Sequence, residues 1–124
     1  MTQKRILIAD DDPAVLKITA ARLQHEGFAV TAVADGESAL ATVGRWAPDL
    51  ILLDIRMPRL DGFEVCHRLK ADPATAGLPA IIFTASESHV RHLADRCLEL
   101  GVADWLRKPY RSKDLLEKIT RVLG

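Results

Sequence analysis

Residues capable of metal or phosphate chemistry occur in this sequence directly after short apolar runs. Three aspartates at 10–12 follow one such run, and Asp54 follows another. Two further apolar runs are followed by a neutral hydroxyl and by a cation, which are Thr84 and Lys108. Open α/β sheets keep their ligand sites beyond the carboxyl ends of buried strands, where these residues would lie. For a single aspartate, a helix cap is the simpler interpretation.

The chemistry of these residue types depends on whether they converge. Each pair of carboxylates costs about 4 kcal/mol at about 4 Å separation and an effective dielectric of about 20. Protons or a cation must relieve this repulsion. A small hard divalent ion does so with oxygen ligands, and Mg2+ typically uses few protein carboxylates and several waters. Lys108 and Thr84 supply a positive charge and a hydroxyl donor for phosphoryl oxygens. With a nucleophilic carboxylate, these groups provide what phosphoryl transfer requires.

The hydrophobic pattern predicts the elements that position these residues. Five apolar runs alternate with five helical patterns along the chain. This alternation predicts an α/β fold, in which a parallel sheet with right-handed crossovers has helices on both faces. The expected strands are 5–10, 28–33, 50–53, 80–83 and 102–106, and the expected helices are 13–26, 37–46, 63–72, 88–100 and 112–123.

A parallel sheet places the carboxyl ends of all its strands at one edge. We therefore expect one crevice to be lined by Asp10, Asp11, Asp54, Thr84 and Lys108. Asp12 precedes a proline at the start of a helical pattern, so it is interpreted as a helix cap and not as a ligand. Asp61 and Gly62 are interpreted as the turn into the third helix. The convergence favours a phosphoryl-transfer site over isolated caps.

Length and composition indicate one globular domain. The chain has 124 residues, of which 48% are hydrophobic and 27% charged, enough for a self-sufficient core. Seventeen basic and seventeen acidic residues cancel, which argues against generic nucleic-acid or membrane-surface binding. Cys66 and Cys97 lack a metal-binding spacing, and no stretch matches a signal-peptide core or a membrane span. We therefore expect reduced thiols in a cytoplasmic protein.

Four motifs resemble those of the receiver domains of two-component response regulators, the CheY-like family. The motifs are Ile-Ala-Asp-Asp-Asp-Pro at 8–13, Asp-Ile-Arg-Met-Pro-Arg-Leu-Asp-Gly at 54–62, Phe-Thr-Ala at 83–85 and Arg-Lys-Pro-Tyr at 107–110. Each motif alone is weak, but four in this order, each at a strand end, are highly specific. The resemblance covers essentially all of the chain. It implies a single receiver domain over 1–124, without an output domain, and the flavodoxin-like strand order 2-1-3-4-5.

The resemblance also implies a role for each acidic residue of the crevice. Asp54 matches the phosphoacceptor of the family. Asp11 matches the direct Mg2+ ligand and Asp10 a mainly water-mediated one, and Arg56 would offer its backbone carbonyl to the ion. The phosphoryl donor is implied to be a histidine kinase or a histidine phosphotransfer protein.

Thr84 and Lys108 are implied to bind the phosphoryl group, with a cis peptide between Lys108 and Pro109. The family's switch position, three residues before the lysine, is usually Tyr, Phe or His, and here it is Trp105. Trp105 either swings inward as Thr84 engages phosphate or simply packs at the strand end, and both interpretations stay open. The implied output surface is formed by the fourth helix, the fifth strand and the fifth helix, and it is a possible dimer interface.

A kinase is expected to dock beside Asp54. Val15 and Ile18 lie one turn apart on the first predicted helix and are not needed for its apolar stripe. Together with Pro109 and Tyr110, they are expected to form a small apolar patch at the mouth of the crevice.

Two other classes of protein are alternatives. The sequence Asp10-x-Asp12, followed later by a Thr and a Lys, is similar to the pattern of haloacid-dehalogenase-like phosphatases. That fold would need its nucleophile on the first strand, a cap and a longer chain. A receiver-like module that binds without being phosphorylated is the third class, but all five key residues are present. The sequence favours a signalling phosphoacceptor that catalyses only its own phosphorylation and dephosphorylation.

Overall fold

The computed structural model describes residues 3–85 and 95–124. Five parallel strands form one sheet in the predicted order β2-β1-β3-β4-β5. The strands are β1 (Arg5–Ala9), β2 (Ala29–Val33), β3 (Leu50–Asp54), β4 (Ala80–Thr84) and β5 (Asp104–Arg107). The helices are α1 (Pro13–His25), α2 (Gly36–Trp46), α3 (Gly62–Ala71) and α5 (Ser112–Leu123). Of the predicted helix 88–100, residues 95–100 are helical, and its earlier residues lie outside the described residues.

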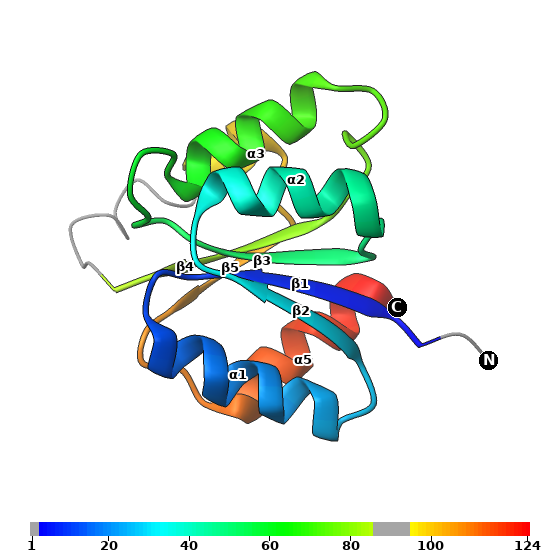
Figure 1. The fold of residues 1–124 in the computed structure, drawn as a ribbon, viewed down its shortest axis with the longest axis vertical. Coiled ribbons are helices and arrows are strands. Elements are labelled where there is room, and N and C mark those ends of the chain that lie inside the picture. Colours follow the sequence, from blue (N-terminus) through cyan, green and yellow to red (C-terminus); the bar gives the residue numbers. More distant parts are fainter. Residues whose placement is uncertain (1–2, 86–94) are drawn as a thin grey trace.

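Helices cover both faces of the sheet, as predicted. α2 and α3 lie on one face, and α1 and α5 lie on the other (Figure 1). Successive side chains of a strand point to opposite faces. On β3, Ile51 and Leu53 belong to the core on the side of α2 and α3, whereas Leu50 and Leu52 belong to the core on the side of α1 and α5. All four side chains are fully buried, which explains the continuous apolar run.

Aspartates begin three of the helices. The side chain of Asp12 accepts hydrogen bonds from the backbone N–H groups at the start of α1, which confirms its interpretation as a cap. Asp35 and Asp61 cap α2 and α3 in the same way. Each such cap stabilises its helix by about 1 kcal/mol. The three loops that carry the caps follow β1, β2 and β3 at the carboxyl edge of the sheet.

Strands β2 and β5 begin later than the apolar pattern predicts. Phe28 donates its backbone N–H to the Leu23 carbonyl at 3.1 Å, and Val102 donates to the Cys97 carbonyl at 2.8 Å. Each follows a glycine with positive φ, so both residues belong to helix-terminating turns of the Schellman type. These two apolar residues therefore form part of the helix ends and not of the strands that follow.

Cys66 and Cys97 are free thiols, as expected, and both are buried in the core on the side of α2 and α3. Burial raises the pKa of the Cys66 thiol to about 12, so the thiol stays protonated near neutral pH. Within residues 3–85 and 95–124, no helix combines the length and the apolar character needed to cross a bilayer.

Candidate functional site

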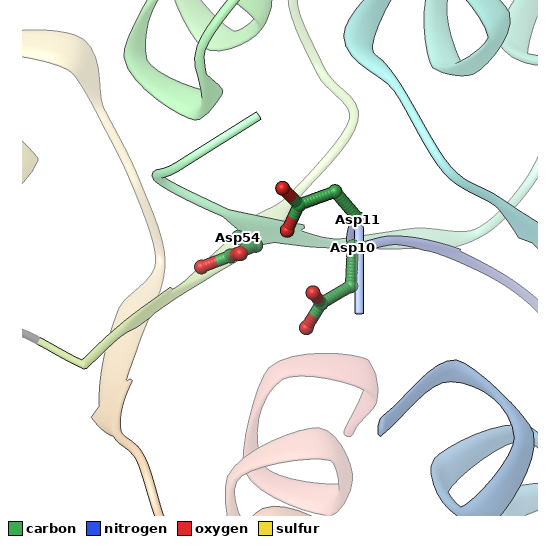
Figure 2. A group of neighbouring side chains, drawn as sticks. All are labelled: Asp10, Asp11 and Asp54. Atoms are coloured by element: carbon green, nitrogen blue, oxygen red, sulfur yellow. The ribbon is translucent and has the colours of Figure 1, made fainter. Parts of the chain in front are cut away.

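The ends of β1 and β3 bring three carboxylates together (Figure 2). Asp10 and Asp11 directly follow β1, and Asp54 is the last residue of β3. One carboxylate oxygen from each residue lies within 4.8 Å of those from the other two. The strand register explains this convergence, because Ala9 pairs with Leu53 and the next residue on each strand is an aspartate. The three carboxylates therefore converge as predicted.

These carboxylates differ in their exposure to solvent. Asp10 is fully buried and Asp54 is 6% exposed, whereas Asp11 is exposed. Burial is the main cause that raises the pKa of Asp54 to about 6, and the negative charge of Asp10 raises it further, against the opposing effect of Lys108. The ionised form of Asp54 is thus costly here, and a cation beside it would stabilise that form.

Lys108 reaches the carboxylates from the turn after β5. Its Nζ lies 2.5 Å from Asp10 Oδ2 and 3.5 Å from Asp54 Oδ2. Burial by itself would lower the pKa of Lys108, but the hydrogen bond to Asp10 and the charges of Asp54 and Asp10 raise it overall. Lys108 is therefore cationic at neutral pH. One ammonium faces three carboxylates, so the four side chains carry an excess of negative charge when ionised.

The backbone around Lys108 is tied to the neighbouring strand. The Lys108 N–H donates to the Thr84 carbonyl at 2.7 Å, and the Lys108–Pro109 peptide is cis, as the resemblance implied. Thr84 is 1% exposed and ends β4, which pairs with β3. Asp54, Thr84 and Lys108 thus come from the ends of three strands that are neighbours in the sheet.

A cleft of about 560 Å³ opens beside Asp11. Exposed Arg56 contributes to its wall, together with other residues of the β3–α3 loop and with Asp61. Asp61 also accepts a hydrogen bond from the Glu64 N–H at 2.9 Å, which confirms its predicted place at the start of α3. Asp12 caps α1, and its own N–H donates to Asp10 Oδ1 at 3.0 Å. Asp12 is thus not part of the three-carboxylate cluster.

Gly62 has a structural role that sequence reasoning missed. A Cβ at this position would lie 2.5 Å from the backbone carbonyl oxygen of Asp54, so only glycine lets α3 begin directly against the strand end. The Gly62 N–H also donates to the Ile55 carbonyl at 2.9 Å. The signal in the sequence was a glycine at the first position of a helix, where its helix propensity is poor.

Tyr110 does not lie in the exposed apolar patch where it was predicted. Ile18 is 69% exposed and Pro109 is also exposed, but Tyr110 is half-buried. Its hydroxyl lies 2.8 Å from Thr19 Oγ1, and its ring centroid lies 4.9 Å from that of Phe83. Tyr110 therefore belongs to the seam between α1 and the sheet, because a buried phenol needs a polar partner for its hydroxyl.

Trp105 is half-buried near the carboxyl end of β5, where it pairs in register with Ile82 of β4. Its side chain packs against the core on the side of α2 and α3. In this conformation the indole is neither fully inserted nor fully exposed.

Comparisons with known proteins agree with this geometry. The family model described as "Response regulator receiver domain" matches residues 6–120. The response regulator PleD of Caulobacter vibrioides is 42% identical over 105 residues, which are 85% of this chain and 23% of PleD. The DNA-binding response regulator MtrA of Mycolicibacterium smegmatis is 36% identical over 117 residues, which are 94% of this chain and 49% of MtrA. The chain thus spans half or less of these curated relatives.

Solved structures show the same similarity. The receiver domain of the sensor histidine kinase PA1611 from Pseudomonas aeruginosa PAO1, with a magnesium ion coordinated in its active site cleft, is 32% identical. It aligns over 99% of both chains with a TM-score of 0.88. A CheY-like receiver domain protein from Methanospirillum hungatei JF-1 is 35% identical over 98% of this chain and 94% of its own, with a TM-score of 0.85. These matches support the receiver interpretation over the haloacid-dehalogenase alternative. The chain belongs to the family of response regulator receiver domains.

Proposed function

We propose that this receiver domain acts as a signalling switch by accepting a phosphoryl group on Asp54. The observation that carries this proposal is the charge arrangement at the sheet edge. Three carboxylates lie within 4.8 Å, and a single ammonium from Lys108 lies 3.5 Å from Asp54 Oδ2. Without a metal ion, the negative charges of this site exceed its positive charge. The Lys108 ammonium is also placed where it can bind phosphoryl oxygens on Asp54.

The transfer step uses one carboxylate oxygen of Asp54 as the nucleophile. This oxygen attacks the phosphorus of a phosphohistidine, the P–N bond breaks and a P–O bond forms. The electron pair of the broken bond stays on the donor imidazole, which takes up a proton. Lys108 and the Thr84 hydroxyl stabilise the phosphoryl oxygens. Water then attacks the phosphorus of the acyl phosphate, the P–O bond to Asp54 breaks and inorganic phosphate leaves, which restores the carboxylate. The domain thus catalyses its own phosphorylation and dephosphorylation.

The acidic residues fit a hard divalent cation, because all three offer carboxylate oxygens from a small volume. We assign Asp11 as a direct Mg2+ ligand, since its exposed side chain borders the open cleft. Asp10 already accepts hydrogen bonds from Lys108 and from the Asp12 N–H, which favours contact through water. The Arg56 carbonyl would supply a further oxygen. Bound Mg2+ would neutralise charge on the phosphoryl oxygens and on Asp54.

The proposed donor is a histidine kinase or a histidine phosphotransfer protein that docks on α1. The exposed side chain of Ile18, partly exposed Val15 and exposed Pro109 offer apolar contacts there.

Ile18→Glu should slow transfer from a phosphorylated phosphotransfer domain by about tenfold or more, as expected for a charge in an apolar contact. Labelling by acetyl phosphate should be unaffected, since it needs no docking. Leu98→Glu, at another highly exposed aliphatic residue, is the matched control. Loss of both reactions in Ile18→Glu would show that Ile18 supports the fold.

Output is proposed to pass through β5, α5 and the helix that contains residues 95–100, with Trp105 responding to phosphorylation. The same surface is a candidate dimer interface.

We place the reaction in the cytoplasm, in keeping with buried free thiols.

Phosphorylation with acetyl phosphate and Mg2+ tests the function directly. Intact-mass measurement should show one added phosphate, stable in acid and labile to base and hydroxylamine, as an acyl phosphate is. Asp54→Asn should abolish the label. Asp49→Asn, at the opposite end of β3, should leave the label unchanged. Equal labelling of Asp54→Asn would refute the assignment, and an unlabelled wild-type protein would favour a receiver-like module that is not phosphorylated.

A further inference from the structure

We propose that Tyr110 is a positioning residue for Lys108 and that it acts through its hydrogen bond to Thr19. The Tyr110 hydroxyl and Thr19 Oγ1 are 2.8 Å apart, and Thr19 is 5% exposed in the middle of α1. The Tyr110 ring also lies against Phe83, with 4.9 Å between ring centroids and 30° between planes. The inference rests on the proposed function of Lys108 as the cation that binds the phosphoryl group.

The turn after β5 is anchored on both sides of Lys108. The backbone of Lys108 itself is held by its N–H, which donates to the Thr84 carbonyl at 2.7 Å. The next residue, Pro109, cannot anchor the turn in this way, because it is exposed and has no N–H to donate. Arg111, the N-cap residue of α5, makes no side-chain hydrogen bond that would cap the helix. Tyr110 therefore provides the side-chain anchor between Lys108 and α5.

The Tyr110–Thr19 bond also connects the two halves of the charged site. Thr19 belongs to α1, which begins at Pro13, directly after the aspartates at 10–12. Tyr110 belongs to the turn that carries Lys108. The bond thus joins the element that follows the carboxylates to the turn that carries the cation.

Lys108 needs a fixed backbone position because its own side chain is flexible. A lysine ammonium is a point charge on a four-carbon stem with many rotamers. Small displacements of a group that stabilises a reacting centre have large effects on the reaction. Tyr110→Phe keeps the ring against Phe83 but leaves the Thr19 hydroxyl without this bond, so the turn and the Lys108 Nζ lose a restraint.

Binding of beryllofluoride, a phosphoryl analogue, tests the inference in the full chain. With saturating Mg2+, Tyr110→Phe and Thr19→Val should each weaken beryllofluoride binding by about fivefold, the loss expected for one restraining hydrogen bond. Thr19→Ser, which keeps the hydroxyl, should bind like the wild type. Binding of Mg2+ alone should change by less than about twofold in every variant, because its ligands are carboxylates.

Thr42→Val is the matched control for loss of a buried threonine hydroxyl. Thr42 is 2% exposed, and its Oγ1 donates to the Ser38 carbonyl within α2, away from Lys108 and its turn. This variant should bind beryllofluoride as the wild type does. If Thr42→Val and Thr19→Val weaken binding equally, the effect is a general loss of stability and the inference is wrong.

The decisive comparison introduces Tyr110→Phe into Lys108→Ala. If Tyr110 acts through Lys108, the second change should have no further effect on beryllofluoride affinity. An equal further weakening in that background would overturn the inference, as would an unchanged affinity of Tyr110→Phe alone. If Lys108→Ala itself binds beryllofluoride like the wild type, the proposed function of Lys108 fails, and the inference fails with it.

Discussion

The two edges of the sheet show opposite treatments of charge. At the amino edge, the Arg5 N–H donates to Asp49 Oδ2 at 2.8 Å, and its guanidinium donates to the Trp46 carbonyl at 2.5 Å. The guanidinium carbon also lies 5.6 Å from the centroid of the Trp46 ring. The Asp49 carboxylate thus accepts from a backbone N–H, whereas the Arg5 guanidinium contacts a carbonyl and a ring. Both hydrogen bonds are exposed to solvent, where each contributes modestly to stability.

At the carboxyl edge, three carboxylates cluster, and the Lys108 ammonium contacts the two buried ones, those of Asp10 and Asp54. Burial strengthens the repulsion between like charges. At the amino edge, Arg5 and Asp49 each have a polar partner near solvent. The carboxyl edge instead carries a repulsion between carboxylates that a metal ion can relieve. The comparison indicates that the carboxyl edge concentrates charge at a cost to stability, as a ligand-binding site does, whereas the amino edge does not.

The largest expected effect follows from that repulsion. In metal-free protein at pH 7, Asp54→Asn should stabilise the fold by up to about 3 kcal/mol, because the pKa of Asp54 is raised to about 6 by burial and by Asp10. Asp49→Asn at the other edge should lower stability by less than about 1 kcal/mol, since it weakens a solvent-accessible contact. Urea unfolding in the presence of a chelator measures both. A destabilised Asp54→Asn protein would contradict the comparison.

The same carboxyl predicts a pH dependence with a definite sign. The native state takes up a proton at about pH 6 and the unfolded state only near pH 3.8, so the native state binds more protons between these values. The cost of ionised Asp54 therefore disappears as the pH falls. The stability advantage of Asp54→Asn should shrink below pH 6 and vanish below the unfolded pKa. Saturating Mg2+ should also reduce it, because the ion binds the native wild-type site.

A second prediction separates neighbouring aspartates within the carboxyl edge. Asp11→Ala should weaken Mg2+ binding by about tenfold or more, because it removes the proposed charged oxygen ligand. Asp12→Ala should leave Mg2+ affinity within about twofold but cost about 1 kcal/mol of stability through the lost α1 cap. Calorimetric titration and urea unfolding distinguish the two roles. The reverse pattern of effects would exchange the assignments of cap and ligand.

A third prediction uses the two tryptophans, one at each edge. Trp46 ends α2 beside Arg5, and Trp105 lies on β5 near the functional edge. Beryllofluoride with Mg2+ should shift the emission of Trp46→Phe, in which Trp105 remains. In the proposed switch, Trp105 moves toward a more buried position when Thr84 engages the analogue. The emission of Trp105→Phe should stay constant. Adding Thr84→Ala to Trp46→Phe should remove most of the shift, and a silent Trp105 would mean that output takes another route.

The smallest predicted effects concern backbone strain, which occurs at both edges. Ala47 at the amino edge and Arg59 at the carboxyl edge have positive φ angles of 51° and 68°. Replacing either by glycine should stabilise the protein by about 0.5 to 1 kcal/mol, after the greater freedom of glycine in the unfolded chain is subtracted. Arg59→Gly also loses a contact of 4.0 Å with Asp35, but Arg59 is largely exposed and the pair contributes little. Thermal unfolding measures both variants, and a lower melting temperature in either would count against relief of strain.

Local signals in the sequence were sufficient for most of the fold. Apolar runs predicted the strands, and Asp12 and Asp61 predicted helix starts, because caps and strand burial depend on residues a few positions apart. The parallel topology then predicted that Asp10, Asp54 and Lys108 would converge at one edge. The late starts of β2 and β5 were missed, since Phe28 and Val102 are apolar and only their hydrogen bonds assign them to helix ends.

Tertiary structure alone decided how the neighbours at the site differ. Asp10 and Asp11 are adjacent in sequence, yet one is fully buried against Lys108 and the other borders an open cleft. The bonds that decide this join residues far apart, with 98 positions between Asp10 and Lys108 and 91 between Thr19 and Tyr110. The sequence determined which chemical groups reach the carboxyl edge, because strand ends and turns are locally encoded. Packing of helices on both faces of the sheet decided which of those groups are buried, paired or open to a ligand, because burial depends on layers contributed by distant segments.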